Sequence, residues 1–243
     1  MNKIENVSHL IEAIKTTEGE FNSAQMWFRG LEDASWELIP SIHRKHKILE
    51  AEYANRFRLN APAVYSNCPS TNDYSKWLPL MQHYGLPTRL LDWSESPLIA
   101  LFFAIESKDS DGDRALWMLA PGKLNEIFDF SVIPFLNNEK IQTIVENSFN
   151  RDKLFSNIDF LAVAAPLENP RMSAQMGHFT IHNTRDPLNM HPDVNSFLKK
   201  YIIPYNSVQK IRTELNMLGI RRSKIFPDLT NLAKEISEIV AIE

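Results

Sequence analysis

Residues 83–105 read HYGLPTRLLDWSESPLIALFFAI, and the second half of this stretch decides the fold. The closing run PLIALFFAI is apolar at every position, which favours a helix buried on all sides over one that lies on the surface. Ser96 is of the residue type that caps a helix N-terminus, and Pro97 suits the first helical position. We therefore predict a buried helix over residues 97–105.

Outward from this helix, apolar periodicity predicts strands and helices in an order without a regular βαβ rhythm. The first predicted helix carries the apolar repeat Val7, Leu10, Ile11 and Ile14, and its start is capped by Asn6 or Ser8. The other predicted helices cover residues 48–60, 74–82 with an interruption near Pro79, 97–105, 207–218 and about 229–239. Predicted strands cover residues 24–30, 36–40, 115–119, 160–165, 177–182 and 201–204. The pattern indicates an α+β fold with mixed or antiparallel central sheets flanked by helices. No internal repeat or Gly/Ser linker divides the chain, so we predict a single domain over residues 1–243.

The composition excludes several classes of protein. The single cysteine, Cys68, rules out an intramolecular disulfide framework and a cysteine-rich zinc site, and it fits a reducing compartment. A net charge of -4, from 26 basic and 30 acidic residues, lacks the overall basic character of non-specific nucleic-acid binders. The first ten residues hold no apolar core of signal-peptide length, and no later run reaches bilayer length. We expect a cytoplasmic protein with no membrane partner.

The first candidate site is Trp27-Phe28-Arg29-Gly30. A guanidinium beside a glycine can meet an anion closely, because glycine permits close approach and the guanidinium forks onto phosphate or carboxylate with two hydrogen bonds. An internal ion pair, for instance with Asp92, is the alternative that these four residues alone leave open.

The second candidate site is the loop that runs from His83 to Ser94, in which Gly85 and Pro87 break regular structure. Leu90, Leu91 and Trp93 are most simply interpreted as core residues. The polar residues His83, Thr88, Arg89 and Asp92 must pair with one another or meet a ligand. The start of the predicted helix at Ser96 would direct free N–H groups toward this loop, which favours phosphate. An anion site and a structural Arg89–Asp92 pair both remain open.

The third candidate site is Arg171-Met172-Ser173-Ala174-Gln175-Met176-Gly177-His178-Phe179. On a strand, Gln175, Gly177 and Phe179 would share one face. The Gln175 amide would offer a ligand both a donor and an acceptor, and Gly177 would let that ligand approach the backbone closely. An edge strand with a surface glutamine is the alternative.

No metal site is predicted. His178 and His182 lie four residues apart on a predicted strand and lack a third ligand nearby, while the other histidines are scattered. A Ser-His-Asp triad has no nucleophile elbow to support it.

Together these motifs resemble the FRG domain family, which is named for an aromatic-Arg-Gly motif near the N-terminus. The matching segments are Phe28-Arg29-Gly30, residues 82–94, residues 96–104, Arg171 with residues 175–179, and residues 219–229. They extend over about residues 7–240, so the resemblance implies that the chain is one FRG domain.

More remotely, the arrangement is similar to the ADP-ribosyltransferase superfamily, in which an Arg-Gly or His-Gly pair on the first core strand binds NAD. This resemblance implies an ADP-ribosyltransferase-like cleft with NAD as its substrate. The residues it implies for catalysis are Arg29, His83, Asp92 and Gln175, and those for NAD binding are Phe28, Arg29, Gly30, Thr88, Arg89 and Gly177. Gln175 departs from the pattern, because a catalytic glutamate normally stands there and an amide supplies no negative charge to an oxocarbenium ion.

Three functions stay open. The first is an NAD-dependent ADP-ribosyltransferase or NAD glycohydrolase, a toxin or antiphage effector that modifies a protein or nucleic acid and that an antitoxin restrains. In this function Arg29 and Arg89 bind the pyrophosphate, and Thr88 and Gln175 bind ribose hydroxyls. Asp92 orients Arg89 or His83. The second is a non-catalytic nucleotide- or phosphate-binding interaction module, which the missing glutamate favours. The third is another hydrolase, with His83 and Asp92 as general acid and base.

Overall fold

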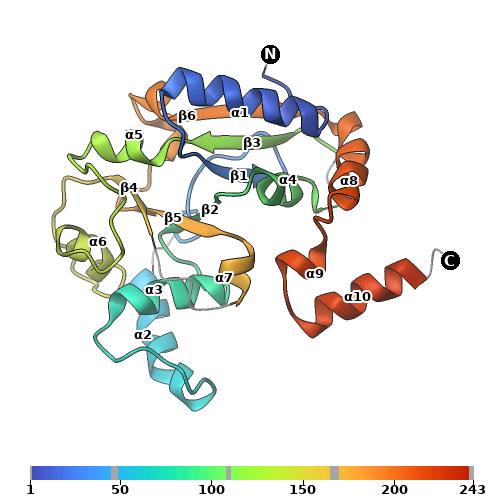
Figure 1. Cartoon of the computed structure of the whole chain (residues 1–243). Coiled ribbons are helices and arrows are strands. Elements are labelled where there is room, and N and C mark those ends of the chain that lie inside the picture. Colours follow the sequence, from blue (N-terminus) through green and yellow to red (C-terminus); the bar gives the residue numbers. More distant parts are fainter. Residues whose placement is uncertain (1, 45–48, 108–110, 165–169, 241–243) are drawn as a thin grey trace.

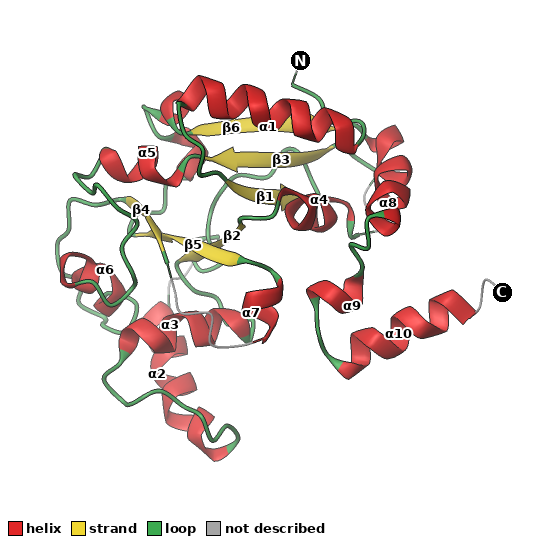
Figure 2. Ribbon diagram, in the orientation of Figure 1, coloured by secondary structure: helices red, strands yellow, loops and turns green. Residues whose placement is uncertain are grey.

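The computed structural model describes residues 2–44, 49–107, 111–164 and 170–240, and its centre is a six-stranded sheet (Figure 1, Figure 2). The strands are β1 Trp27–Leu31, β2 Leu90–Ser94, β3 Arg114–Leu119, β4 Phe160–Val163, β5 Gly177–His182 and β6 Leu198–Ile203. They lie in the order β4-β5-β2-β1-β3-β6, and each neighbouring pair is antiparallel. The predicted α+β class with an antiparallel central sheet is confirmed.

Two groups of helices cover one face of this sheet. In chain order, the α-helices are α1 Val7–Phe21, α2 Glu50–Asn60, α3 Tyr74–His83, α4 Pro97–Ile105, α5 Pro121–Glu126, α6 Gln142–Glu146, α7 Pro170–Ala174, α8 Val208–Met217, α9 Arg222–Ile225 and α10 Leu229–Val240. Buried residues of α1, α4 and α8 pack on β1, β3 and β6, whereas those of α2, α3 and α6 pack on β2, β4 and β5. The two helix groups therefore meet above the junction of β1 and β2.

The opposite face carries a third core that includes Trp27, Trp93 and Trp117. It is closed by α5 and by loops that supply Leu38 and Leu188. Because side chains alternate along a strand, β1 sends Phe28 to the helical face and Trp27 to this third core.

Helix α4 covers the predicted residues 97–105, and it lies tightly against β1. Pro97 is its first residue, and the Ser96 hydroxyl accepts from the Ile99 N–H at 3.4 Å. A Cβ at Gly30 would lie 1.9 Å from the Ala100 carbonyl oxygen, so only glycine allows this contact. The close approach that the sequence indicated at Gly30 is thus made by a helix of the chain itself.

Several boundaries agree with expectation. Helix α1 begins at Val7, with Asn6 as the cap that accepts from the His9 N–H at 2.8 Å. Strand β5 covers the predicted residues 177–182, and β6 begins at Leu198, three residues before its predicted start. Residue 165, the last of the predicted strand at 160–165, lies outside the described residues.

Three expectations for local structure are wrong. Residues 36–40 form no strand, because Leu38 inserts into the third core and its backbone bonds to Leu188 and to the Asn189 side chain. Helix α3 continues through Pro79 without the predicted interruption. Gln175 lies in the turn between α7 and β5 rather than on a strand, since Met176 adopts a left-handed φ of 47° before β5 begins.

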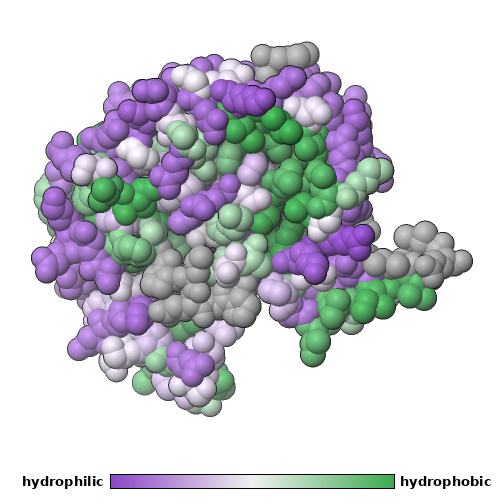
Figure 3. Space-filling view, viewed as in Figure 1, coloured by the Kyte–Doolittle hydropathy of each residue, from purple (hydrophilic) through white to green (hydrophobic). Residues whose placement is uncertain are grey.

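Helix α10 projects from the rest of the molecule, and apolar side chains follow it in Figure 3. Leu229, Leu232, Ile236 and Val240 are exposed at the helical spacing of three to four residues. Within the described ranges, no helix combines the length and the apolar character needed to cross a bilayer.

Candidate functional site

A cavity of ≈ 340 Å³ opens where the two helix groups meet above β1 and β2. Its walls come from both strands, from α3, α4 and α7, and from the turn into β5. The predicted residues that line it are Phe28, Arg29, Gly30, His83, Asp92, Gln175 and Gly177. Further lining residues are Glu32, Trp36, Gln82, Phe103, Glu106, Arg171 and His178.

The separation of β1 from β2 creates this space. The two strands share one register pair, Phe28 with Ser94, whereas β1 pairs with β3 at five positions. Beyond Phe28 the strands diverge, and Arg29 bridges the gap by donating from Nη1 to the Asp92 carbonyl at 2.6 Å. A strand carbonyl that would otherwise pair across the sheet is therefore satisfied by a guanidinium.

Arg29 also faces the Asp92 carboxylate, with 3.9 Å between Nη1 and Oδ2. Its side chain is 19% exposed, and that of Asp92 is 57% exposed. Burial lowers the pKa of Arg29, and the nearby Asp92 carboxylate opposes this shift. The sequence left an Arg29–Asp92 pair and an anion site as alternatives. In the structure Arg29 and Asp92 face each other, and both line the cavity.

A relay of hydrogen bonds orients the Asp92 carboxylate. The buried Thr88 hydroxyl donates to Gln82 Oε1 at 2.5 Å, and Gln82 Nε2 donates to Asp92 Oδ2 at 2.7 Å. The Leu90 N–H donates to the same Thr88 hydroxyl at 3.1 Å. Thr88 does not line the cavity and acts on it through Gln82, a residue that the sequence reasoning did not assign to the site.

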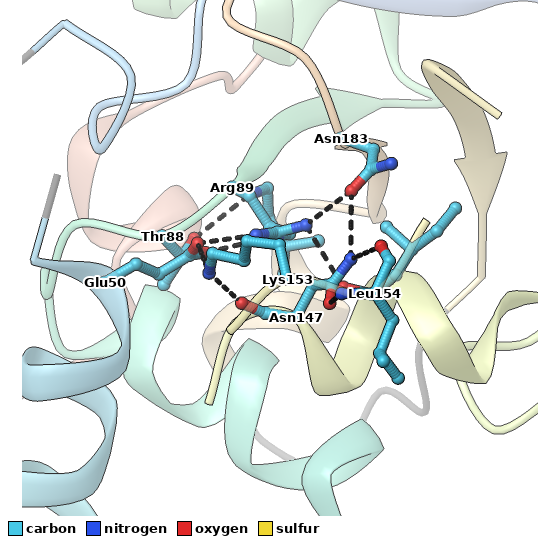
Figure 4. A network of polar contacts seen from close by, with 9 residues as sticks. Glu50, Thr88, Arg89, Asn147, Lys153, Leu154 and Asn183 are labelled. Carbon is cyan, nitrogen blue, oxygen red and sulfur yellow. Dashed lines mark hydrogen bonds and ion pairs between the residues drawn. The ribbon is translucent and has the colours of Figure 1, made fainter. Parts of the chain in front are cut away.

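Arg89 lies away from the cavity, in a buried polar network (Figure 4). It is 3% exposed and donates to both carboxylate oxygens of Glu50, at 2.9 and 2.6 Å. Its Nη1 donates to the Ile144 carbonyl at 3.2 Å and to Asn183 Oδ1 at 3.1 Å. Of the two alternatives that the sequence left open, the Arg89–Asp92 pair does not form, because residues three apart on an extended segment point to opposite sides, and Arg89 does not line the cavity as an anion site would require.

The carboxylate of Glu50 is ionised within this network. Burial alone would raise its pKa, but the hydrogen bonds and charge of Arg89 outweigh burial and lower the pKa. Lys153 Nζ lies 3.6 Å from Glu50 Oε2 and adds to this effect. Burial and the charge of Arg89 lower the pKa of the neighbouring His43 to about 4. The network joins α2, the residue before β2, and α6, and it is structural rather than exposed to ligand.

His83 and Gln175 contribute from the ends of α3 and α7. Burial and the positive charge of Arg171 lower the pKa of His83, so its imidazole is neutral at pH 7. Gln175 Nε2 donates to the Ile225 carbonyl at 3.3 Å, and the Gln175 carbonyl accepts from the Ser94 hydroxyl at 2.7 Å. The amide of Gln175 is thus held by the segment that carries α9.

The histidines of β5 have protein partners. His178 Nε2 lies 2.8 Å from Glu95 Oε1, and the ring stacks on Trp27 with 4.5 Å between centroids. His182 Nε2 lies 2.9 Å from the Thr180 hydroxyl. Among the residues that the structure describes, no group of three His, Cys, Asp or Glu side chains could hold a metal ion.

Several lining residues were not identified from the sequence as members of the site. Trp36, 45% exposed, and the buried side of Phe103 add aromatic surface, while Glu32 and Glu106 add carboxylates. The one available signal was spacing, since Phe103 and Glu106 lie one turn apart at the end of α4.

Comparison with protein families gives one match. The family model of the FRG domain matches residues 24–113, a stretch that contains Phe28-Arg29-Gly30, residues 82–94 and α4. This match supports the FRG family for the part of the chain that supplies the lining residues of β1, α3, β2 and α4. No match was found among curated proteins or among solved structures.

Proposed function

We propose that the chain binds NAD or a related nucleotide in this cavity and cleaves the bond between nicotinamide and ribose, as an ADP-ribosyltransferase or NAD glycohydrolase does. The observation that supports the proposal is the convergence of Arg29, His83, Asp92 and Gln175 on one cavity from four separate segments. A volume of ≈ 340 Å³ falls in the range of about 300–1,000 Å³ that is common for small-molecule sites.

The Asp92 carboxylate can supply the negative charge that Gln175 lacks. When the C1′–N bond of NAD breaks, its electron pair leaves with nicotinamide and the ribose becomes an oxocarbenium ion. A carboxylate held by Gln82 at 2.7 Å, yet 57% exposed, is pre-organised to stabilise that cation. Gln82 and Thr88 are then positioning residues, because both act through Asp92.

His83 is suited to accept a proton during the second half of the reaction. Attack of water on C1′ gives ADP-ribose and releases one proton, which a neutral imidazole can take up. If the nucleophile belongs to a protein or nucleic-acid acceptor, the same step transfers ADP-ribose to that acceptor. Gln175 would hydrogen-bond a ribose hydroxyl in either case.

Nicotinamide release from NAD tests the proposal. We expect wild type to release nicotinamide and Asp92→Asn to lose about 100-fold or more in kcat while still binding NAD, because the amide keeps the shape but not the charge. Asp152→Asn, at an exposed carboxylate outside the cavity, is the matched control. An intact NAD pool together with absent NAD binding by wild type would refute the proposal.

The second candidate is a non-catalytic nucleotide- or phosphate-binding interaction module. The amide at Gln175, already bonded to the Ile225 carbonyl, favours it. This candidate predicts that NAD or ADP binds without release of nicotinamide, and that Asp92→Asn leaves every measured property except affinity unchanged.

An enzyme of the first kind would act in the cell as a toxin or antiphage effector that an antitoxin restrains. Induced expression of wild type should then arrest growth and deplete NAD or modify an acceptor. Asp92→Asn, expressed to the same level, should not. Equal growth with both proteins would count against the toxin role.

A further inference from the structure

Arg171 is a cation that lines the cavity, and within the described part of the chain no polar partner meets its guanidinium. It lies in α7, and its exposed side chain makes no hydrogen bond and no ion pair with the described residues. The other lining arginine, Arg29, donates from Nη1 to the Asp92 carbonyl and faces the Asp92 carboxylate, while its buried Nε has no hydrogen-bond partner among the described residues. The five N–H donors of Arg171 are therefore available to a ligand.

An aromatic ring holds the Arg171 guanidinium in place. Its Cζ lies 4.7 Å from the centroid of Phe226, the residue that follows α9. A guanidinium stacked on a ring keeps its N–H edges free for two parallel bonds to a phosphate. Stacking thus restricts the side chain without consuming its donors.

Phe226 is itself fixed by its neighbours. The ring of Phe103, which lines the cavity, meets it edge-on with 5.8 Å between centroids and an interplanar angle of 87°. Arg222 also stacks on Phe226, at 5.0 Å, and is anchored by Asn231 at 2.7 Å and by an ion pair with Glu106. The platform for Arg171 is consequently rigid.

Three acidic residues in or near the cavity, Asp92, Glu106 and Asp228, interact mainly with residues other than Arg171 and do not neutralise its charge. Asp92 faces Arg29, and Glu106 pairs with Arg222. Asp228 lies near enough for Arg171 to help lower its pKa, but both its oxygens accept hydrogen bonds from Asn231, the larger cause of that shift.

We propose that Arg171 binds the phosphate of the cavity's ligand and that Phe226 is its positioning residue. This assignment rests on the proposed function and changes the expected roles within it. The sequence predicted Arg29 and Arg89 for the pyrophosphate, yet Arg89 is bonded to Glu50 and Arg29 to Asp92. Arg171 takes over that role; it lies in the third candidate segment, residues 171–179, but the resemblance assigned it no part in NAD binding.

Calorimetric titration with ADP and with adenosine tests the assignment in the full-length chain. Wild type should bind ADP more tightly than adenosine. Arg171→Gln should weaken ADP binding by about tenfold or more, the effect of one lost charged hydrogen bond, and leave adenosine binding unchanged. Arg151→Gln, at an exposed arginine outside the cavity, is the matched control. A wild-type ADP-to-adenosine ratio in Arg171→Gln would overturn the assignment.

Phe226 requires a readout that separates positioning from folding. Phe226→Tyr keeps a stacking ring and should retain ADP affinity, whereas Phe226→Leu should weaken ADP binding several-fold with an unchanged thermal midpoint. Equal ADP affinity in Phe226→Leu and wild type would remove the positioning role.

Inorganic pyrophosphate separates this inference from the proposed function. If wild type binds pyrophosphate but no nucleotide, and Arg171→Gln loses the pyrophosphate, the anion site stands and nucleotide binding falls. If wild type binds neither nucleotide nor pyrophosphate, both fall.

Discussion

Replacement of Arg89 by methionine should destabilise the protein strongly without disturbing the cavity. The change removes both hydrogen bonds to Glu50 and leaves a buried carboxylate with Lys153 at 3.6 Å as its nearest cation. Loss of one partner from a buried ion pair costs about 3–5 kcal/mol. We expect the upper half of that range, because the Ile144 carbonyl and the Asn183 amide also lose a donor. Against a total stability of about 5–15 kcal/mol, the variant stays folded but weakened.

A double-mutant cycle gives this prediction its control. Arg89→Met combined with Glu50→Leu replaces the pair by apolar groups of similar volume and should recover most of the lost stability. Urea unfolding followed by circular dichroism and by tryptophan fluorescence measures the four free energies. If Arg89→Met lost less than about 1 kcal/mol yet abolished nucleotide binding, the guanidinium would be a ligand-binding group and our reasoning would be refuted.

Three further variants test other parts of the structure. Gly30→Ala should lose about 3 kcal/mol or more in urea unfolding, because its Cβ would lie 1.9 Å from the Ala100 carbonyl oxygen; near-normal stability would mean that α4 can move away. Thr88→Val should reduce nicotinamide release more than NAD affinity, since it frees Gln82 from its donor; an unchanged kcat would argue against the relay. The lowered pKa of His43 means that the unfolded chain binds more protons between pH 6.5 and about 4, so stability should fall as the pH falls through that window, and His43→Gln should flatten this dependence in unfolding measured across it.

Local patterns in the sequence were sufficient for most of the secondary structure. The apolar run at residues 97–105, with a serine cap and a proline at its start, predicted α4 with its observed bounds. Residues 177–182 and 115–119 were predicted as strands on the same grounds, and the structure contains strands there. These predictions depend on periodicity and capping, which act within a few residues.

Local patterns failed where distant residues decide the conformation. The segment at 36–40 has strand-like composition, yet Leu38 is drawn into a core formed with Leu188, and its backbone bonds to Leu188 and to the Asn189 side chain instead of to a strand. Gln175 was expected on a strand, but the left-handed backbone of Met176 places it in a turn. Neither outcome can be read from nearest neighbours.

From the sequence by itself, residue types and their settings predicted Arg29, His83, Asp92 and Gln175 as site residues, and all four line one cavity, whereas Thr88 and Arg89, predicted on the same grounds, do not. Only the tertiary structure decided which charges are paired. Arg89 meets Glu50, 39 residues away in the chain, whereas Arg171 stacks on Phe226 and has no hydrogen-bond or ion-pair partner for its side chain in the ranges that the structure describes. The physical reason is that Glu50 on α2 and Phe226 after α9 come next to these arginines only through the packing of elements that lie far apart in the chain.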